Sequence, residues 1–200
     1  MSILSRENSE RLFWLGRYSE RVYTGLRSLE LDLSAGDKAK NLCFDEANPE
    51  TISYSLARAY DNAIVLRDEI GTETFSYIQM AVYEMKNAQR SGTPLMPLQK
   101  VIDNIAAFWG MADDIIEDEH ARGIIKLGKR IERVDLYSRM NSGSEEIRRE
   151  IRRLTYRIAK TGLRYDAERV KRLNELAKET NINRQEIIKE VESLINFEEI

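Results

Sequence analysis

Apolar residues recur at three- and four-residue steps along most of this chain, the spacing that places them on one face of an α-helix. In the first such stretch, from Ser5 to about Leu33, aliphatic side chains form one stripe and most charged side chains lie opposite it. Similar stripes predict further helices over about 49–70, 73–89, 97–115, 121–140, 145–161, 166–179 and 184–197. No stretch alternates Val, Ile or Thr with polar residues as a half-buried strand would. The pattern therefore predicts an all-α bundle of about seven to eight helices.

Several residues at the ends of these stretches are typical of helix starts. Ser5 is expected to cap the first helix, and Thr72 the third. Pro49 suits the first turn of the second helix. Ser142 with Glu145, and Asn183 with Glu186, have the spacing of a capping box. We therefore expect one domain over residues 1–200, with a core over 1–141 and a helical extension over 142–200.

The composition narrows the class of protein. Of 200 residues, 42% are hydrophobic and 32% are charged, and the net charge is −3 with both signs closely mixed. This balance gives no basic patch of the kind that binds nucleic acid. No window approaches the roughly 18 apolar residues that span a membrane, and the first residues lack the apolar core of a signal peptide. The single cysteine, Cys43, cannot form an internal disulfide, so we expect a cytoplasmic protein in which Cys43 is a buried hydrophobe.

One motif occurs twice. Leu-Gly-cation-x-x-Glu-Arg-Val stands at Leu15–Val22 and again at Leu127–Val134, shifted by 112 positions. Repeated segments of this kind indicate repeated structural units. The sequence therefore predicts two copies of one helix, each with a glycine one turn before a Glu-Arg pair.

The Glu-Arg pairs allow two interpretations. In each copy, the glycine leaves space for another backbone or for a ligand to approach. In the structural interpretation, Glu20 and Glu132 pair with arginines of facing helices and fix the register of the bundle. In the other, the two copies line a polar cleft that recognises an anionic group such as a carboxylate. The residues of that cleft would be Glu10, Arg17, Glu20, Arg21, Lys129, Glu132 and Arg133.

Other candidate sites are weaker. Glu117-x-x-His120 has the spacing of one ligand pair of a di-iron bundle, with Asp113 and Asp114 upstream, but such a site needs two pairs and the chain has one histidine. The sequence contains no phosphate-binding loop and no dinucleotide fingerprint. We therefore expect no metal and no cofactor.

Three stretches together resemble the alpha-E family of bacteria and archaea, helical proteins with a duplicated Glu-Arg signature. The stretch Glu7–Arg21 is similar to the family's opening motif. The region from Leu42 to Asp68 is similar to its second helix, and Phe108–Gly110 followed by Leu127–Asp135 to its second copy. The resemblance covers roughly residues 4–140. The linker after the first helix is shorter than is usual in the family.

The resemblance implies a helical fold, no established reaction, and an association with ATP-grasp ligases and transglutaminase-like proteins that make or attach small peptides. It also adds motif positions to the polar site, namely Glu7, Asn8, Arg11, Asn62 and Arg67. The leading hypothesis is an accessory component that binds such a ligase, or its peptide, through the Glu-Arg face. One alternative is an enzyme of amide-bond formation or hydrolysis with a glutamate as general base. The other is a purely structural helical homodimer.

Overall fold

The computed structural model describes residues 4–31, 43–91, 94–140 and 142–197, and within these ranges the chain is all-α. One isolated bridge joins Tyr165 to Ile195, and no strand forms in the described ranges. The helices are α1 (Arg6–Leu31), α3 (Ile52–Val65), α4 (Arg67–Ile70), α5 (Thr72–Arg90), α6 (Leu95–Ile115), α7 (Glu119–Arg139), α8 (Ser144–Ile158), α9 (Ala167–Leu176) and α10 (Arg184–Glu192).

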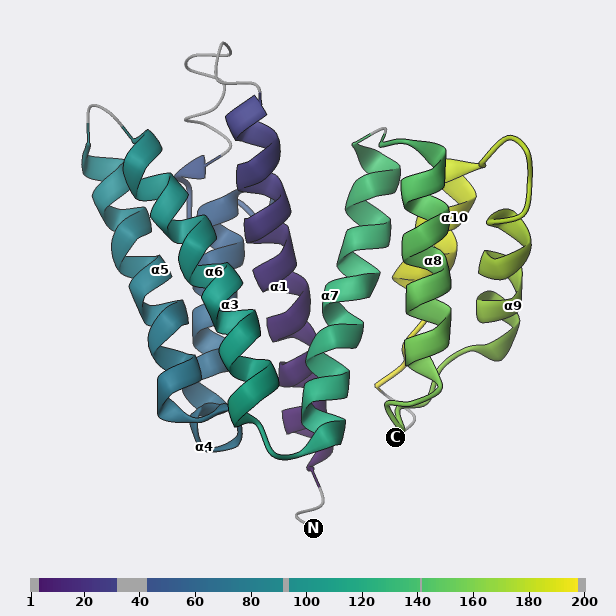
Figure 1. Ribbon diagram of the computed structural model, residues 1–200, viewed down its shortest axis with the longest axis horizontal. Coiled ribbons are helices and arrows are strands. Elements are labelled where there is room, and N and C mark those ends of the chain that lie inside the picture. The colour runs from purple at the N-terminus through teal and green to yellow at the C-terminus, as the bar shows by residue number, and fades with distance from the viewer. Residues whose placement is uncertain (1–3, 32–42, 92–93, 141, 198–200) are drawn as a thin grey trace.

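The helices form two groups that meet at α1 and α7 (Figure 1). In the first group, α1 packs against α3 and α6, and α5 packs against α3 and α6. In the second group, α8 and α10 pack against α7, and α9 covers them from outside. The pairing of α1 with α7 therefore joins the first half of the chain to the second, and it brings the two copies of the motif together.

The predicted helices are present, with differences at some starts and ends. Ser5 caps α1, since its Oγ accepts a hydrogen bond from the Asn8 N–H at 3.0 Å. The second predicted helix is split at Leu66 into α3 and α4, which is why nine helices are found in the described ranges and not seven to eight. The prediction for Pro49 was wrong, because Pro49 lies in a turn and Thr51 caps α3.

Two further caps differ from expectation. Thr72 is the first residue of α5, and Gly71 stands at the N-cap with φ of 81°, a conformation that favours glycine. The cap of α8 is shifted by one residue, because the Glu146 carboxylate accepts from the Gly143 N–H at 3.0 Å. Asn183 caps α10 as predicted, through a 3.2 Å bond from the Glu186 N–H.

The core is built from the aliphatic stripes of all the longer helices, with Phe108, Leu12, Leu15, Leu26 and Leu127 among the fully buried side chains. Cys43 is buried as expected, and burial raises the pKa of its thiol to about 11. In the part of the chain that the structure describes, no helix combines the length and the apolar character needed to cross a bilayer.

Candidate functional site

The two motif helices touch at their glycines. A Cβ added to Gly16 would lie 2.1 Å from the Ile125 carbonyl oxygen, and a Cβ added to Gly128 would lie 2.1 Å from the Phe13 carbonyl oxygen. Phe13 and Ile125 are themselves 112 positions apart, so the contact is reciprocal, like that of an isologous interface. The space that each glycine leaves is therefore filled by the backbone of the other copy.

One turn beyond this crossing, Glu132 of α7 meets two arginines of α1. Arg17 Nε donates to Glu132 Oε2 at 2.7 Å, and Arg21 Nε donates to Oε1 at 2.5 Å. The Glu132 side chain is 0% exposed, and Arg17 is buried as well. Arginines at positions i and i+4 lie on one face of a helix, which is why both can reach the same carboxylate.

On the other side, Glu20 of α1 meets Arg133 of α7. Arg133 donates through Nε and Nη2 to the two oxygens of Glu20 at 2.7 and 2.8 Å, which is the strong bidentate arrangement. Thr24 Oγ1 adds a bond to Glu20 Oε1 at 2.7 Å. Glu20 is also 0% exposed. Each carboxylate is thus held by cations of the other copy, within one chain.

Aromatic side chains cover the cations differently in the two copies. On α1, the Arg17 guanidinium lies 5.0 Å from the Trp14 ring, and Trp14 stacks on Tyr18. On α7, Lys129 takes the place of Arg17, and its Nζ lies 3.0 Å from the ring centroid of Trp109 of α6. In the described ranges Lys129 makes no ion pair within 4.0 Å. The two copies are therefore not equivalent: Glu132 has two arginine partners, whereas Glu20 has one arginine and Thr24, because Lys129 lies over Trp109.

The electrostatics follow from burial and pairing. Burial alone would raise the pKa of Glu132, but the charges and hydrogen bonds of Arg17 and Arg21 outweigh it and hold that pKa below its ordinary value. Burial dominates at Lys129 and lowers its pKa to about 7, although the charge of Glu20 acts the other way. Asp135 has a raised pKa because of burial and the nearby Glu132 charge. The arginines thus keep Glu132 ionised, whereas burial makes Lys129 easier to deprotonate.

This arrangement can lock two helices, and it leaves the carboxylates little capacity for chemistry. All four carboxylate oxygens of Glu20 and Glu132 accept hydrogen bonds from side chains of this chain. A general base needs an oxygen within hydrogen-bond reach of a substrate proton. The geometry therefore agrees with the structural interpretation of the pairs.

Of the twelve predicted site residues, the structure brings six together: Arg17, Glu20, Arg21, Lys129, Glu132 and Arg133. The stretch Glu7–Arg11, which holds Glu7, Asn8, Glu10 and Arg11, lies 9–13 residues earlier on α1, or about 14–20 Å along the helix. There Glu7 pairs with Arg11 at 2.8 Å, and Asn8 Nδ2 donates to Glu69 of α4.

The remaining two predicted residues lie on other helices. Asn62 donates to the Arg58 backbone carbonyl within α3, and Arg67 lies over the Phe75 ring at 5.3 Å. Sequence reasoning also missed two members of the cluster. Thr24 stands one turn after Glu20, a spacing that could have revealed it. Trp109 comes from a third helix, and no local pattern connects it to Lys129.

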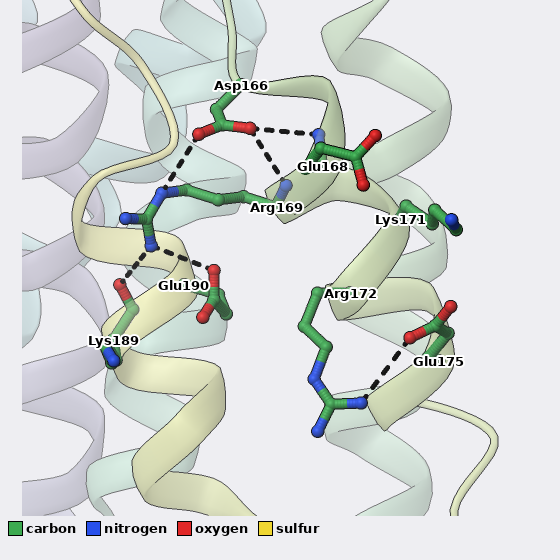
Figure 2. Close-up of a pocket in the computed structure, with 8 residues that line it drawn as sticks. All are labelled: Asp166, Glu168, Arg169, Lys171, Arg172, Glu175, Lys189 and Glu190. Atoms are coloured by element: carbon green, nitrogen blue, oxygen red, sulfur yellow. Dashed lines mark hydrogen bonds and ion pairs between the residues drawn. The ribbon is translucent and has the colours of Figure 1, made fainter.

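A separate cavity of about 390 Å³ lies between α9 and α10 (Figure 2). Its charged groups largely neutralise one another. Arg169 pairs with Glu190 at 2.9 Å and with Asp166 at 3.4 Å, and Arg172 pairs with Glu175 at 3.5 Å. The lining contains four cations and four carboxylates, namely Arg169, Lys171, Arg172 and Lys189 with Asp166, Glu168, Glu175 and Glu190. The cavity is therefore lined by ion pairs of α9 and α10 and has no excess of either charge.

The acidic segment before α7 is a helix junction. Asp118 caps α7 by accepting from the His120 N–H at 2.8 Å, and Asp113 pairs with Lys126. His120 and Glu117 are exposed. Within the described ranges, no three His, Cys, Asp or Glu side chains are placed to hold a metal ion.

Residues 34–152 match the Alpha-E family, described as a predicted alpha-helical domain with a conserved ER motif. No curated protein and no solved structure matches. The match includes the second copy of the motif and α7, whereas the first copy lies before it, outside the matched residues. Since the match covers more than half of the 200 residues, the chain belongs to the Alpha-E family.

Proposed function

We propose that this chain is a non-catalytic helical component that binds a protein or peptide partner of a peptide ligase system, an ATP-grasp ligase or a transglutaminase-like protein. In this proposal the Glu-Arg motif is an internal clamp that sets the register of α1 against α7. The observation that supports the clamp, and with it a non-catalytic role, is that side chains of this chain bind all four oxygens of the two buried carboxylates. The association with a ligase comes from the family resemblance.

The same observation counts against an enzyme that uses Glu20 or Glu132 as general base. Each carboxylate is 0% exposed, and both of its oxygens accept hydrogen bonds from arginines that are themselves mostly buried. A substrate proton would have to displace one of these charge-assisted bonds, which are about twice as strong as neutral ones. The clamp needs no such exchange.

The homodimer alternative receives no specific support from the pairs. Arg17 and Arg21 reach Glu132, and Arg133 reaches Glu20, inside a single chain. A second copy is therefore not needed to complete either cluster. Sedimentation of the purified chain over a range of concentrations measures whether a dimer forms by another surface.

The binding function is tested by calorimetric titration of the purified chain with an ATP-grasp ligase and with a transglutaminase-like protein from the same source. We expect saturable binding to one of them, and no ligation or hydrolysis of amino acids and short peptides by the chain alone. Turnover by the chain alone, or no binding to either protein, contradicts the proposal.

The clamp is tested separately with Glu132→Gln, using Glu7→Gln as the matched control on an exposed carboxylate. We expect Glu132→Gln to lower the free energy of unfolding and to reduce partner binding only in proportion to the folded fraction. Full stability combined with lost binding would mean that Glu132 contacts the partner, and the clamp would be wrong.

A further inference from the structure

A basic groove runs along the N-terminal half of α7. One part, about 150 Å³, lies between α7 and the end of α8, and a smaller part, about 40 Å³, lies between α7 and α6. Arg122 and Lys126 line both parts, so the two are neighbours along one helix face. The residues that we call the basic groove are Arg122, Lys126, Lys129, Arg157 and Lys160.

The charge in this groove is strongly one-sided. Its lining carries four cations, Arg122, Lys126, Arg157 and Lys160, and also Lys129, whose pKa burial lowers to about 7, against two carboxylates, Asp113 and Glu119, although the chain as a whole has a net charge of −3. The cavity between α9 and α10, by contrast, has equal numbers of both signs. Cations gathered in a concave space raise the local potential and attract anions.

The cations of the groove are also poorly neutralised. Lys126 pairs with Asp113 at 2.5 Å, and Arg122 donates to the Ile116 carbonyl at 2.7 Å. Lys160 contacts the Tyr156 hydroxyl. The Arg157 guanidinium makes neither a hydrogen bond nor an ion pair among the described residues, and burial together with the nearby Arg130 charge lowers its pKa, although the Asp113 charge acts the other way. An unpaired, half-buried guanidinium facing other cations is costly unless an anion joins it.

The ligand must bring more than one negative charge in a small volume. A single carboxylate would leave most of the excess positive charge in place, whereas a phosphoryl group carries up to two charges and several acceptor oxygens. Arginine binds phosphate with two parallel hydrogen bonds, and lysine binds it as a point charge. The larger part of the groove has about ten times the volume that one water needs, so a compact anion has room there.

We propose that the basic groove binds a phosphoryl group, with Arg157, Arg122 and Lys126 as its ligands. The larger part of the groove would hold the phosphorus and its oxygens, and Lys129 would lie at the inner end. This inference goes beyond the proposed function and does not depend on it, since a phosphoryl group can be bound whether or not the chain serves a ligase.

The test uses Arg157→Met, with Arg152→Met as the matched control. Both arginines lie on α8 and both changes remove one positive charge, but Arg152 is exposed and pairs with Glu145 at 2.9 Å. Because Arg157 has no ion pair to lose, Arg157→Met should fold with an unchanged or higher melting temperature, which circular dichroism measures.

Pyrophosphate is titrated calorimetrically into the three proteins at low ionic strength. We expect saturable binding by the wild type, at least tenfold weaker binding by Arg157→Met, and binding within twofold of the wild type by Arg152→Met. Inorganic phosphate and ATP, run as further arms, distinguish a free anion from a nucleotide as the source of the phosphoryl group. Failure of all three probes to bind, or equal binding by Arg157→Met and the wild type, overturns the inference.

Discussion

The reciprocal contact between the motif glycines makes a quantitative prediction for Gly128→Ala. The new methyl group would lie 2.1 Å from the Phe13 carbonyl oxygen and 3.1 Å from the Arg17 nitrogen, and both of these are backbone atoms. A rotamer change cannot relieve this contact, so α1 and α7 must separate by about 1 Å to restore ordinary packing distances. Overpacking of this kind costs about 1–3 kcal/mol, and stretching the Glu-Arg bonds adds to it.

The control is Gly110→Ala on α6, where a Cβ would meet nothing within 4 Å. Both changes gain about 0.8–1 kcal/mol from helix propensity, so their difference isolates the crossing. We expect Gly110→Ala to be stabilised by about 1 kcal/mol, and Gly128→Ala to be less stable than Gly110→Ala by about 1–3 kcal/mol, a net loss of up to about 2 kcal/mol relative to the wild type before any loss from the Glu-Arg bonds.

The assay is urea unfolding followed by circular dichroism, with Gly16→Ala as a second variant of the same crossing. Gly16→Ala should lose about as much as Gly128→Ala, because its methyl group meets the Ile125 carbonyl in the same way. The double variant should lose less than the sum, since helices already separated by one methyl group accept the second at lower cost. Equal stabilities of Gly128→Ala and Gly110→Ala would refute the close backbone crossing.

Predictions for three residues of the clusters, Glu132, Lys129 and Thr24, follow from the same geometry. Glu132→Gln should cost about 3–5 kcal/mol, against less than about 0.5 kcal/mol for Glu7→Gln. Because the folded-state pKa of Glu132 lies below the ordinary 4.5, its contribution is present above that pH and is lost on acidification, so urea titrations should show a smaller acid loss in Glu132→Gln. Burial lowers the pKa of Lys129 from 10.5 to about 7, so between these pH values the unfolded chain binds more protons than the folded chain, and the free energy of unfolding should rise with pH. Lys129→Met should abolish this rise. At pH 6 it should raise the free energy of unfolding by about 1–3 kcal/mol, because the contact with Trp109 offsets only part of the cost of burying the charge. Thr24→Val should cost about 1.5–3 kcal/mol, measured in the same titrations, because it removes a hydrogen bond to a buried charge.

Much of the fold could be predicted because each long helix carries its own apolar stripe. The pattern predicts the second motif helix over 121–140, and α7 spans Glu119–Arg139. Helix starts were less predictable where a neighbouring residue also caps well. Thr51 competes with Pro49, and Gly143 with Ser142, and the outcome depends on how the chain enters the bundle.

The candidate site was only partly open to prediction. The repeat indicated that Glu20 and Glu132 belong together, but it could not say whether backbone or ligand fills the space beside the glycines. That depends on how closely two helices approach, and a local sequence does not contain this distance. Asn62 and Arg67, which came from the resemblance, lie on helices that face other partners.

The basic groove shows the same limit. Arg122, Lys126 and Lys129 follow one another at steps of four and three residues, so their common face on α7 was readable from the sequence. Arg157 belongs to the next long helix, α8, and it lies beside the cations of α7 only because α8 packs against α7.

Because α1 pairs with α7, the first copy of the motif cannot find its partner until the ribosome has synthesised the second copy. At about 5–20 residues per second, the 112 positions between the two copies take the ribosome roughly 6–22 s. For this interval α1 has emerged without the helix that covers Glu20, Arg17 and the adjoining leucines. During this interval α3 and α6 can already pack on α1, but its α7 face stays uncovered, and Glu20 and Arg17 stay unpaired, until the second half of the chain arrives.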